Sequence, residues 1–208
     1  MSSTASEICK PVDQATLLRV ALASIESGLD SGSQLQVDPG NFPAALSSRG
    51  ATFVTLKHNG ELRGCIGSLE PLSSLVEDVA RNAYAAAFRD PRFPALTAAE
   101  LQDLEIGISV LGPTEPVEFG SEAELLGRLR PGIDGLVLRD GHHRGTFLPA
   151  VWASLPKPAE FLGYLKQKAG LPCDYWSDTL EIERYTTQSF ASGIAGIRQM
   201  QGESANAG

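Results

Sequence analysis

Cysteine is scarce in this sequence, and long apolar runs are missing. The three cysteines, Cys9, Cys65 and Cys173, form no CxxC pair. This pattern argues against a disulfide framework and fits the reducing cytoplasm. No apolar stretch approaches the roughly 20 residues that span a bilayer, and the first ten residues lack a basic segment followed by an apolar one. We therefore expect a cytoplasmic protein with free thiols and no membrane contact.

The signature motifs of the common enzyme classes are also missing. GxGxxG, the Walker loop, GxSxG and HExxH do not occur, which excludes the usual nucleotide-binding, serine-hydrolase and zinc-protease sites. The formal net charge is −8, so the backbone of a nucleic acid would be repelled unless a local basic patch overcame the mean charge. We expect neither a cofactor nor a nucleic-acid partner.

Hydrophobic residues make up 42% of the 208 residues, enough to bury the core of one large domain or two small ones. We place this domain at residues 9–190. Loose ends are expected at 1–8 and 199–208, because they offer too little apolar surface to become ordered. A first amphipathic helix is predicted from Pro11 to Gly28, because apolar residues fall on one helical face. These residues are Leu17, Leu18, Ala21, Leu22 and Ile25.

A β-hairpin is predicted after a long polar connection. Residues 53–56 are strand formers, and Asn59-Gly60 is the strongest short signal for a hairpin turn. The returning strand is expected at 61–67. Pro71 is then expected to open a helix that reaches Phe88. Its outward face is predicted to carry Glu77, Asp78, Arg81 and Asn82.

The same pattern returns 81 residues later. Asp140-Gly141 predicts a second tight turn, and Arg144-Gly145 stands where Arg63-Gly64 stands in the first hairpin. This match predicts two internal repeats, at about 51–111 and 116–185. The predicted fold class is α+β, with duplicated β-hairpin and helix units that share one curved mixed sheet.

The returning strand of the first hairpin is the main candidate for chemistry. Side chains alternate along a strand, so Arg63 and Cys65 are expected on one face and Gly64 on the other. A nearby positive charge favours a thiolate, the form that acts as a nucleophile. The alternative is structural: Cys65 fills apolar space, and Gly64 marks a bulge or a close backbone approach. The sequence favours neither.

A second candidate is the segment Arg89-Asp90-Pro91-Arg92-Phe93-Pro94, which packs charges and an aromatic ring into a proline-stiffened turn. Such a turn is a suitable place for ligand contacts. The alternative is a helix end with solvated charges. No metal is expected at His142-His143, because adjacent strand residues face opposite ways and no third ligand has the right spacing.

Leu62-Arg63-Gly64-Cys65-Ile66-Gly67 resembles the LRGCIG hallmark of the AMMECR domain family, whose microbial members are called AmmeMemoRadiSam system protein A. The resemblance runs from about Ala15 to Tyr185. The sequence departs from a strict repeat at Thr146, which occupies the place that matches Cys65. Further segments that look like family positions are Asp90-Pro91-Arg92-Phe93-Pro94, Ile108-Ser109-Val110-Leu111, Gly132-Ile133-Asp134-Gly135-Leu136, Phe147-Leu148-Pro149 and Lys168-Ala169-Gly170-Leu171.

The resemblance implies an α+β fold with a duplicated β-β-β-α-α pattern and a single barrel-like sheet, but no settled activity. We expect a ligand- or partner-binding component that acts with a radical SAM enzyme and a Memo-like protein. The alternative is a cysteine-dependent enzyme that uses Cys65 as nucleophile on a small anionic substrate. The expected ligand contacts are Arg63, Gly64, Arg89, Asp90, Arg92, Arg144 and Thr146.

Overall fold

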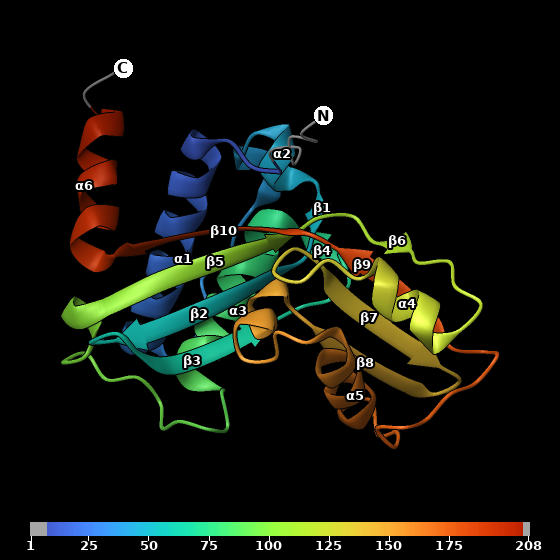
Figure 1. Cartoon of the computed structure of the whole chain (residues 1–208). Helices are drawn as coiled ribbons and strands as arrows, with labels where there is room; N and C mark the ends of the chain where they lie inside the picture. The colour runs from blue at the N-terminus through green and yellow to red at the C-terminus, as the bar shows by residue number, and fades with distance from the viewer. Residues whose placement is uncertain (1–7, 206–208) are drawn as a thin grey trace. The chain divides into compact units, whose positions relative to one another are not determined.

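The computed structural model of this chain describes residues 8–205 and divides into two compact units. The first unit runs to Leu111 and resumes at Gln188, whereas the second unit is Gly112–Thr187. The chain therefore leaves the first unit, builds the second and returns to complete the first. Figure 1 shows the elements with their labels.

The first unit is built on a four-stranded sheet in the order β10-β5-β2-β3. Its strands are β2 (Thr52–His58), β3 (Glu61–Gly67), β5 (Leu104–Leu111) and β10 (Thr187–Gly193). The short strands β1 (Arg49–Gly50) and β4 (Ser73–Ser74) pair separately. The helices are α1 (Pro11–Ser31), α2 (Ala44–Ser47), α3 (Leu75–Phe88) and α6 (Ile194–Ala205), with 3-10 turns η1 (Pro39–Asn41) and η2 (Leu101–Asp103).

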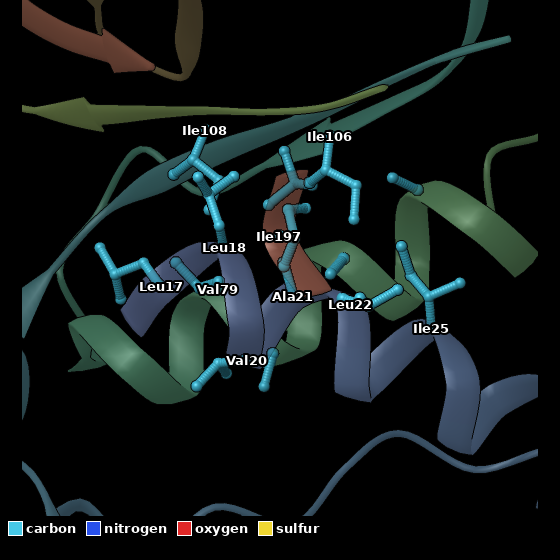
Figure 2. Close-up of a cluster of buried hydrophobic side chains, with 14 of the residues drawn as sticks. Leu17, Leu18, Val20, Ala21, Leu22, Ile25, Val79, Ile106, Ile108 and Ile197 are labelled. Carbon is cyan, nitrogen blue, oxygen red and sulfur yellow. The ribbon is translucent and has the colours of Figure 1, made fainter. Parts of the chain in front are cut away.

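One face of this sheet packs against helices to form the core of the first unit (Figure 2). The predicted apolar face of α1 is confirmed, since its five named residues are at most 3% exposed. Ile106 and Ile108 of β5 and Ile197 of α6 join the same cluster. Buried residues alternate with less buried ones along β2 and β5, so the opposite face of the sheet lies outside this core.

The first helix is longer than predicted. It continues past Gly28 to Ser31, and Gly32, with a φ of 71°, forms the left-handed cap that ends it. Gly28 instead permits close packing, because a Cβ there would lie 2.2 Å from the ring of Phe88.

The helix after the first hairpin differs from the prediction in two respects. It begins at Leu75 rather than at Pro71, because Ser74 and Glu77 form a capping box. The predicted outward face is wrong for Asp78 and Asn82, which are 0% and 3% exposed. These two side chains are buried because they form a hydrogen-bonded network with β2, described below.

The second unit has its own four-stranded sheet, in the order β6-β9-β7-β8. Its strands are β6 (Glu115–Pro116), β7 (Gly135–Asp140), β8 (His143–Phe147) and β9 (Glu181–Tyr185). Its helices are α4 (Glu122–Arg128) and α5 (Pro158–Lys168), with the 3-10 turn η3 (Pro149–Ala153). The core includes Trp152 stacked on Phe161 at 3.8 Å between ring centroids.

The two units repeat one plan. In each, a hairpin is followed by a helix and then by a strand that pairs antiparallel with the first hairpin strand: β2-β3-α3-β5 and β7-β8-α5-β9. The fold is α+β with duplicated hairpin and helix units. The predicted single curved, barrel-like sheet is wrong, because residues 8–205 form two separate four-stranded sheets and neither is closed. The first strand of each hairpin is paired on both sides within its own unit.

The two hairpin turns differ in detail. Asn59 and Gly60 both have positive φ, 52° and 84°, as a type I′ turn requires. In the second hairpin Asp140 pairs with His143, so the loop residues are Gly141 and His142 rather than Asp140 and Gly141. Gly141 provides the positive φ of 58°.

The C-terminal part of the chain is more ordered than predicted. β10 adds to the sheet beside β5, and α6 continues to Ala205. The expected loose end at 199–208 therefore includes helical residues. Residues 1–7 and 206–208, where the remaining loose ends were predicted, lie outside the described part of the chain. None of the helices within residues 8–205 combines the length and the apolar character needed to cross a lipid bilayer.

Candidate functional site

Cys65 lies on β3, one of the two edge strands of the four-stranded sheet in the first unit. Its thiol is half-buried and lies 3.3 Å from the hydroxyl of Thr55 on β2, the residue that pairs with it across the hairpin. Gly64 points toward α3, where an added Cβ would lie 2.1 Å from the carbonyl oxygen of Ala86. Cys65 therefore faces the side of the sheet opposite the helices. Gly64 has a packing role, as the structural alternative proposed.

The turn after α3 closes the edge of the sheet at Cys65. Asp90 Oδ2 accepts from the backbone N–H of Cys65 at 2.9 Å, and Arg92 Nη2 donates to the carbonyl of Cys65 at 3.2 Å. Arg92 also donates to both oxygens of Asp90, through Nε at 3.0 Å and Nη2 at 2.7 Å. The structure therefore brings Cys65, Asp90 and Arg92 together, although Cys65 is 25 residues from Asp90 and 27 residues from Arg92 in the sequence.

Asp90 and Arg92 stabilise each other in their charged forms. The hydrogen bond from the Arg92 side chain, with those from backbone N–H groups, holds the pKa of Asp90 well below its ordinary range although burial opposes this. The same hydrogen bond raises the pKa of Arg92. The side chain of Asp90 is buried, whereas that of Arg92 is 53% exposed. Its described hydrogen bonds use Nε and Nη2, so Nη1 is left for a further acceptor.

Arg63 does not take the position that strand alternation predicts. Leu56 pairs with Gly64 and Lys57 with Leu62, so Arg63 is the extra residue of a β-bulge. Its side chain is buried, and it donates from Nε to Glu100 Oε1 at 2.6 Å and from Nη2 to Oε2 at 3.4 Å. The sequence suggested a positive charge beside the thiol, but Glu100 compensates the charge of Arg63.

Glu100 is in turn fixed by the chain before it. Its Oε2 accepts from the backbone N–H of Thr97 at 2.9 Å and from the Thr97 hydroxyl at 2.8 Å. The hydrogen bond from Arg63, followed by those from Thr97, lowers the pKa of Glu100 to about 2. Nothing in the sequence signals that Glu100 is also the partner of Arg63.

The remaining predicted contacts lie elsewhere. Arg89 is exposed, and its guanidinium carbon is 6.0 Å from the ring centroid of Tyr84. In the second unit, Arg144 is exposed and pairs in register with Arg139, unlike the buried Arg63. Thr146 is buried and its hydroxyl donates to the Leu136 carbonyl at 2.7 Å. Arg144 and Thr146 thus belong to the second unit, whereas Cys65 lies in the first.

A cavity of about 230 Å³ opens on the face of the first sheet that Cys65 shares with Thr55. Its walls come from β2, β5 and β10 and carry hydroxyl groups, small residues and one charge pair. Ser109 and Ser189 bond to each other at 2.8 Å, and Lys57 lies 3.5 Å from Glu105. The lining residues are Thr55, Lys57, Glu105, Gly107, Ile108, Ser109, Ser189, Phe190 and Ala191.

A buried polar network ties α3 to the start of β2. Asp78 Oδ2 accepts from the backbone N–H and the hydroxyl of Thr52, both at 2.8 Å, and from Asn82 Nδ2 at 2.8 Å. Asn82 also donates to Ser68, which directly follows the LRGCIG strand, and Arg81 pairs with Asp78. This network holds the helix against both hairpin strands. Its sequence signal was the spacing of Asp78 and Asn82 by four residues, one helical turn apart.

The histidine pair does not lie as predicted. His142 is in the hairpin turn, so strand alternation does not separate it from His143, and the two rings lie 4.2 Å apart. His143 Nδ1 is 3.0 Å from the Ala169 carbonyl. Within residues 8–205, no group of three or more His, Cys, Asp or Glu side chains is placed to hold a metal ion.

Comparison with known proteins identifies relatives along most of the chain. Residues 18–190 match the family described as AMMECR1. The chain is 38% identical over 177 residues to a protein of Methanothermobacter thermautotrophicus, which covers 84% of this chain and 92% of that protein. It is 35% identical over 177 residues to protein MJ0810 of Methanocaldococcus jannaschii, which covers 83% and 87% of the two chains.

A solved structure is also similar. The crystal structure of the uncharacterized protein PH0010 from Pyrococcus horikoshii matches with a TM-score of 0.81 and 32% sequence identity. The match covers 89% of this chain and 94% of that chain. The duplicated α+β architecture is therefore common to both proteins.

Proposed function

Because the chain belongs to the AMMECR1 family, we propose that it is a ligand-binding component whose site lies beside Cys65, on the sheet face opposite the helices. One observation carries the proposal. Thr55 contacts the Cys65 thiol at 3.3 Å and also lines the cavity of about 230 Å³. Sites for drug-sized ligands are about 300–1,000 Å³, so this cavity fits a smaller molecule.

The chemistry of the cavity favours a small polar ligand. The hydroxyls of Thr55, Ser109 and Ser189 can each donate or accept a hydrogen bond. Lys57 adds a cation whose pairing with Glu105 is long, 3.5 Å, and half-exposed. Such a pair is easily rearranged by a ligand that brings its own negative charge. A small anion with hydrogen-bonding groups is therefore the preferred occupant.

Binding is favoured over nucleophilic catalysis by the surroundings of the thiol. Among the described residues, the hydrogen-bond partner of the Cys65 thiol is the hydroxyl of Thr55, which is not a general base near neutral pH. The carboxylate of Asp90 is bonded to the Cys65 backbone and to Arg92. A nucleophilic cysteine normally has a base within hydrogen-bond reach of its sulfur.

The proposed partners are a radical SAM enzyme and a Memo-like protein. The support for them is the resemblance of the LRGCIG strand and the DPRFP turn to AmmeMemoRadiSam system protein A. In this proposal the chain holds a small ligand for, or with, these partners. Mixing the purified proteins and measuring the mass of any complex by light scattering tests the partner part separately from the ligand part.

The ligand proposal is tested by native mass spectrometry after incubation of the purified protein with a cell metabolite extract. Ala191→Leu fills the cavity with a larger side chain and should abolish ligand retention. Ala195→Leu makes the same change at an exposed position of α6 that does not line the cavity. Retention by the wild type and Ala195→Leu but not by Ala191→Leu is the expected result. Equal retention by all three proteins would place the ligand elsewhere.

The second candidate function is a cysteine-dependent enzyme, and the half-buried Cys65 thiol one contact away from the cavity favours it. A ligand bound there could be attacked by the sulfur after rearrangement of the Thr55 contact. This candidate requires a thiol that reacts faster than an ordinary exposed cysteine. Its test is the alkylation experiment in the Discussion.

A further inference from the structure

The guanidinium of Arg63 is held in one orientation by the residues around it. Nε and Nη2 donate to the two oxygens of Glu100, and Glu100 is anchored by the backbone and hydroxyl of Thr97. The ring of Phe93 lies 5.9 Å from the guanidinium carbon of Arg63 and 5.4 Å from that of Arg92. Phe93 therefore lies beside both guanidinium groups.

Nη1 of Arg63 is different from the other nitrogens of this side chain. It is fully buried, and none of the described residues accepts a hydrogen bond from it. The residue as a whole is only 9% exposed. A buried charged donor without an acceptor costs stability, so native proteins rarely contain such a group unless a bound water, an ion or a functional role accounts for it.

The charges around Nη1 select the kind of acceptor. Glu100 compensates the charge of Arg63, and the adjacent turn carries a second compensated pair, Asp90 with Arg92. A full negative charge placed on Nη1 would share one guanidinium with the carboxylate of Glu100 and would be repelled by it. An uncharged oxygen brings a hydrogen bond without this repulsion.

We infer that Arg63 Nη1 and the ring of Phe93 form a subsite for an uncharged carbonyl group, such as that of an amide, in which Nη1 donates to the carbonyl oxygen. The inference goes beyond the proposed function, because neither Arg63 nor Phe93 lines the cavity beside Cys65. An apolar ring beside a fixed donor suits the planar amide and its attached carbon atoms. Entry requires Phe93, which is only partly buried, to move aside.

The test uses acetamide, acetate and inorganic phosphate as probes on the full-length, isotopically labelled protein. The side-chain Nε–H signal of Arg63 is followed by NMR during each titration. Acetamide should shift this signal at a concentration about tenfold lower than acetate or phosphate. Arg89→Lys, in the exposed arginine that precedes Asp90, should leave this response intact. The backbone N–H signals of Gly64 and Phe93 are followed in addition, and acetamide should shift them in the wild type but not in Arg63→Lys.

Glu100→Gln provides a second variant that keeps the size of the side chain but removes its charge. If Glu100 sets the preference, this variant should bind acetate more tightly than acetamide. A wild-type preference for acetate or phosphate, or no response of Arg63 to any probe, would overturn the inference. In that case metabolite retention that is still lost in Ala191→Leu would leave the proposed function standing. If instead the wild type retains no metabolite but Arg63 still responds to acetamide, the proposed function fails and the inference about Arg63 stands.

Discussion

At the edge of the sheet, the backbone N–H of Cys65 donates to the side-chain carboxylate of Asp90 at 2.9 Å. Arg92 completes the arrangement by donating to the Cys65 carbonyl at 3.2 Å. The two side chains thus occupy the hydrogen-bonding positions that a neighbouring strand would use. Unpaired strand edges invite association with other chains. The DPRFP turn closes this edge where the LRGCIG strand is exposed.

Asp90→Ala should destabilise the protein by about 2–4 kcal/mol, because it leaves a partly buried N–H without an acceptor and removes the partner of Arg92. Urea unfolding at neutral pH measures the change in the free energy of unfolding. Arg89→Ala, in the exposed residue just before it, should change stability by less than about 0.5 kcal/mol. Similar values for the two variants would mean that the edge closure contributes little.

Alanine substitutions at three glycines should have graded effects. Gly64→Ala should destabilise by about 3 kcal/mol or more, because the new Cβ would lie 2.1 Å from a backbone oxygen. Gly145→Ala should cost less, since its nearest atom is at 3.0 Å. Gly127→Ala in α4 meets nothing within 4 Å and should stabilise by about 0.5–1 kcal/mol. Thermal unfolding of the three variants gives the order of their stabilities. A Gly64→Ala variant as stable as the wild type would contradict the close packing of α3 on β3.

Stability should fall in acid as Glu100 becomes protonated. Its pKa is lowered from an ordinary 4.5 to about 2 in the folded state, so its contribution is present above about pH 4.5 and is lost as the pH falls toward 2. The pKa of Asp90 is also lowered, which adds a loss of the same sign. The stability difference between wild type and Glu100→Gln should therefore shrink across this window. A difference that is constant with pH would show that Glu100 is not ionised against Arg63.

Alkylation should label the three cysteines in the order of their exposure. Cys173 is exposed, Cys65 is half-buried and Cys9 is 2% exposed. If the chain is a binding component, iodoacetamide near neutral pH should modify Cys173 first, Cys65 more slowly and Cys9 last. Mass spectrometry of peptides gives each rate. A Cys65 that reacts faster than Cys173 would favour the cysteine-dependent enzyme instead.

Much of the fold could be predicted because its signals are local. The apolar face of α1 and the turn at Asn59-Gly60 both depend on spacings within a few residues. The Arg-Gly pair after each turn also marks structurally equivalent glycines, since Gly64 and Gly145 both face the helix of their own unit. Helix starts were predicted less well. The helix α3 begins after Ser74, whose side chain caps it, and not at Pro71.

The candidate site could be predicted only in part, and the reason is a single extra residue. Counting back from the Asn59-Gly60 turn places Thr55 opposite Gly64, but the bulge at Arg63 shifts the register so that Thr55 faces Cys65. The second hairpin has no such shift, and there Arg144 pairs with Arg139 and remains exposed. Two identical Arg-Gly pairs therefore acquire different surroundings.

The sequence by itself determined the apolar face of α1, the two hairpins and the residues of the LRGCIG and DPRFP segments. Only the tertiary structure decided that Asp90 and Arg92 close the edge at Cys65, that Glu100 neutralises Arg63 and that each hairpin belongs to its own sheet. Local patterns report backbone preference and burial, which act over one or two turns of the chain. The partners of a buried charge or of a strand edge come from segments that are distant in the sequence. Which segment lies there depends on the packing of the whole unit.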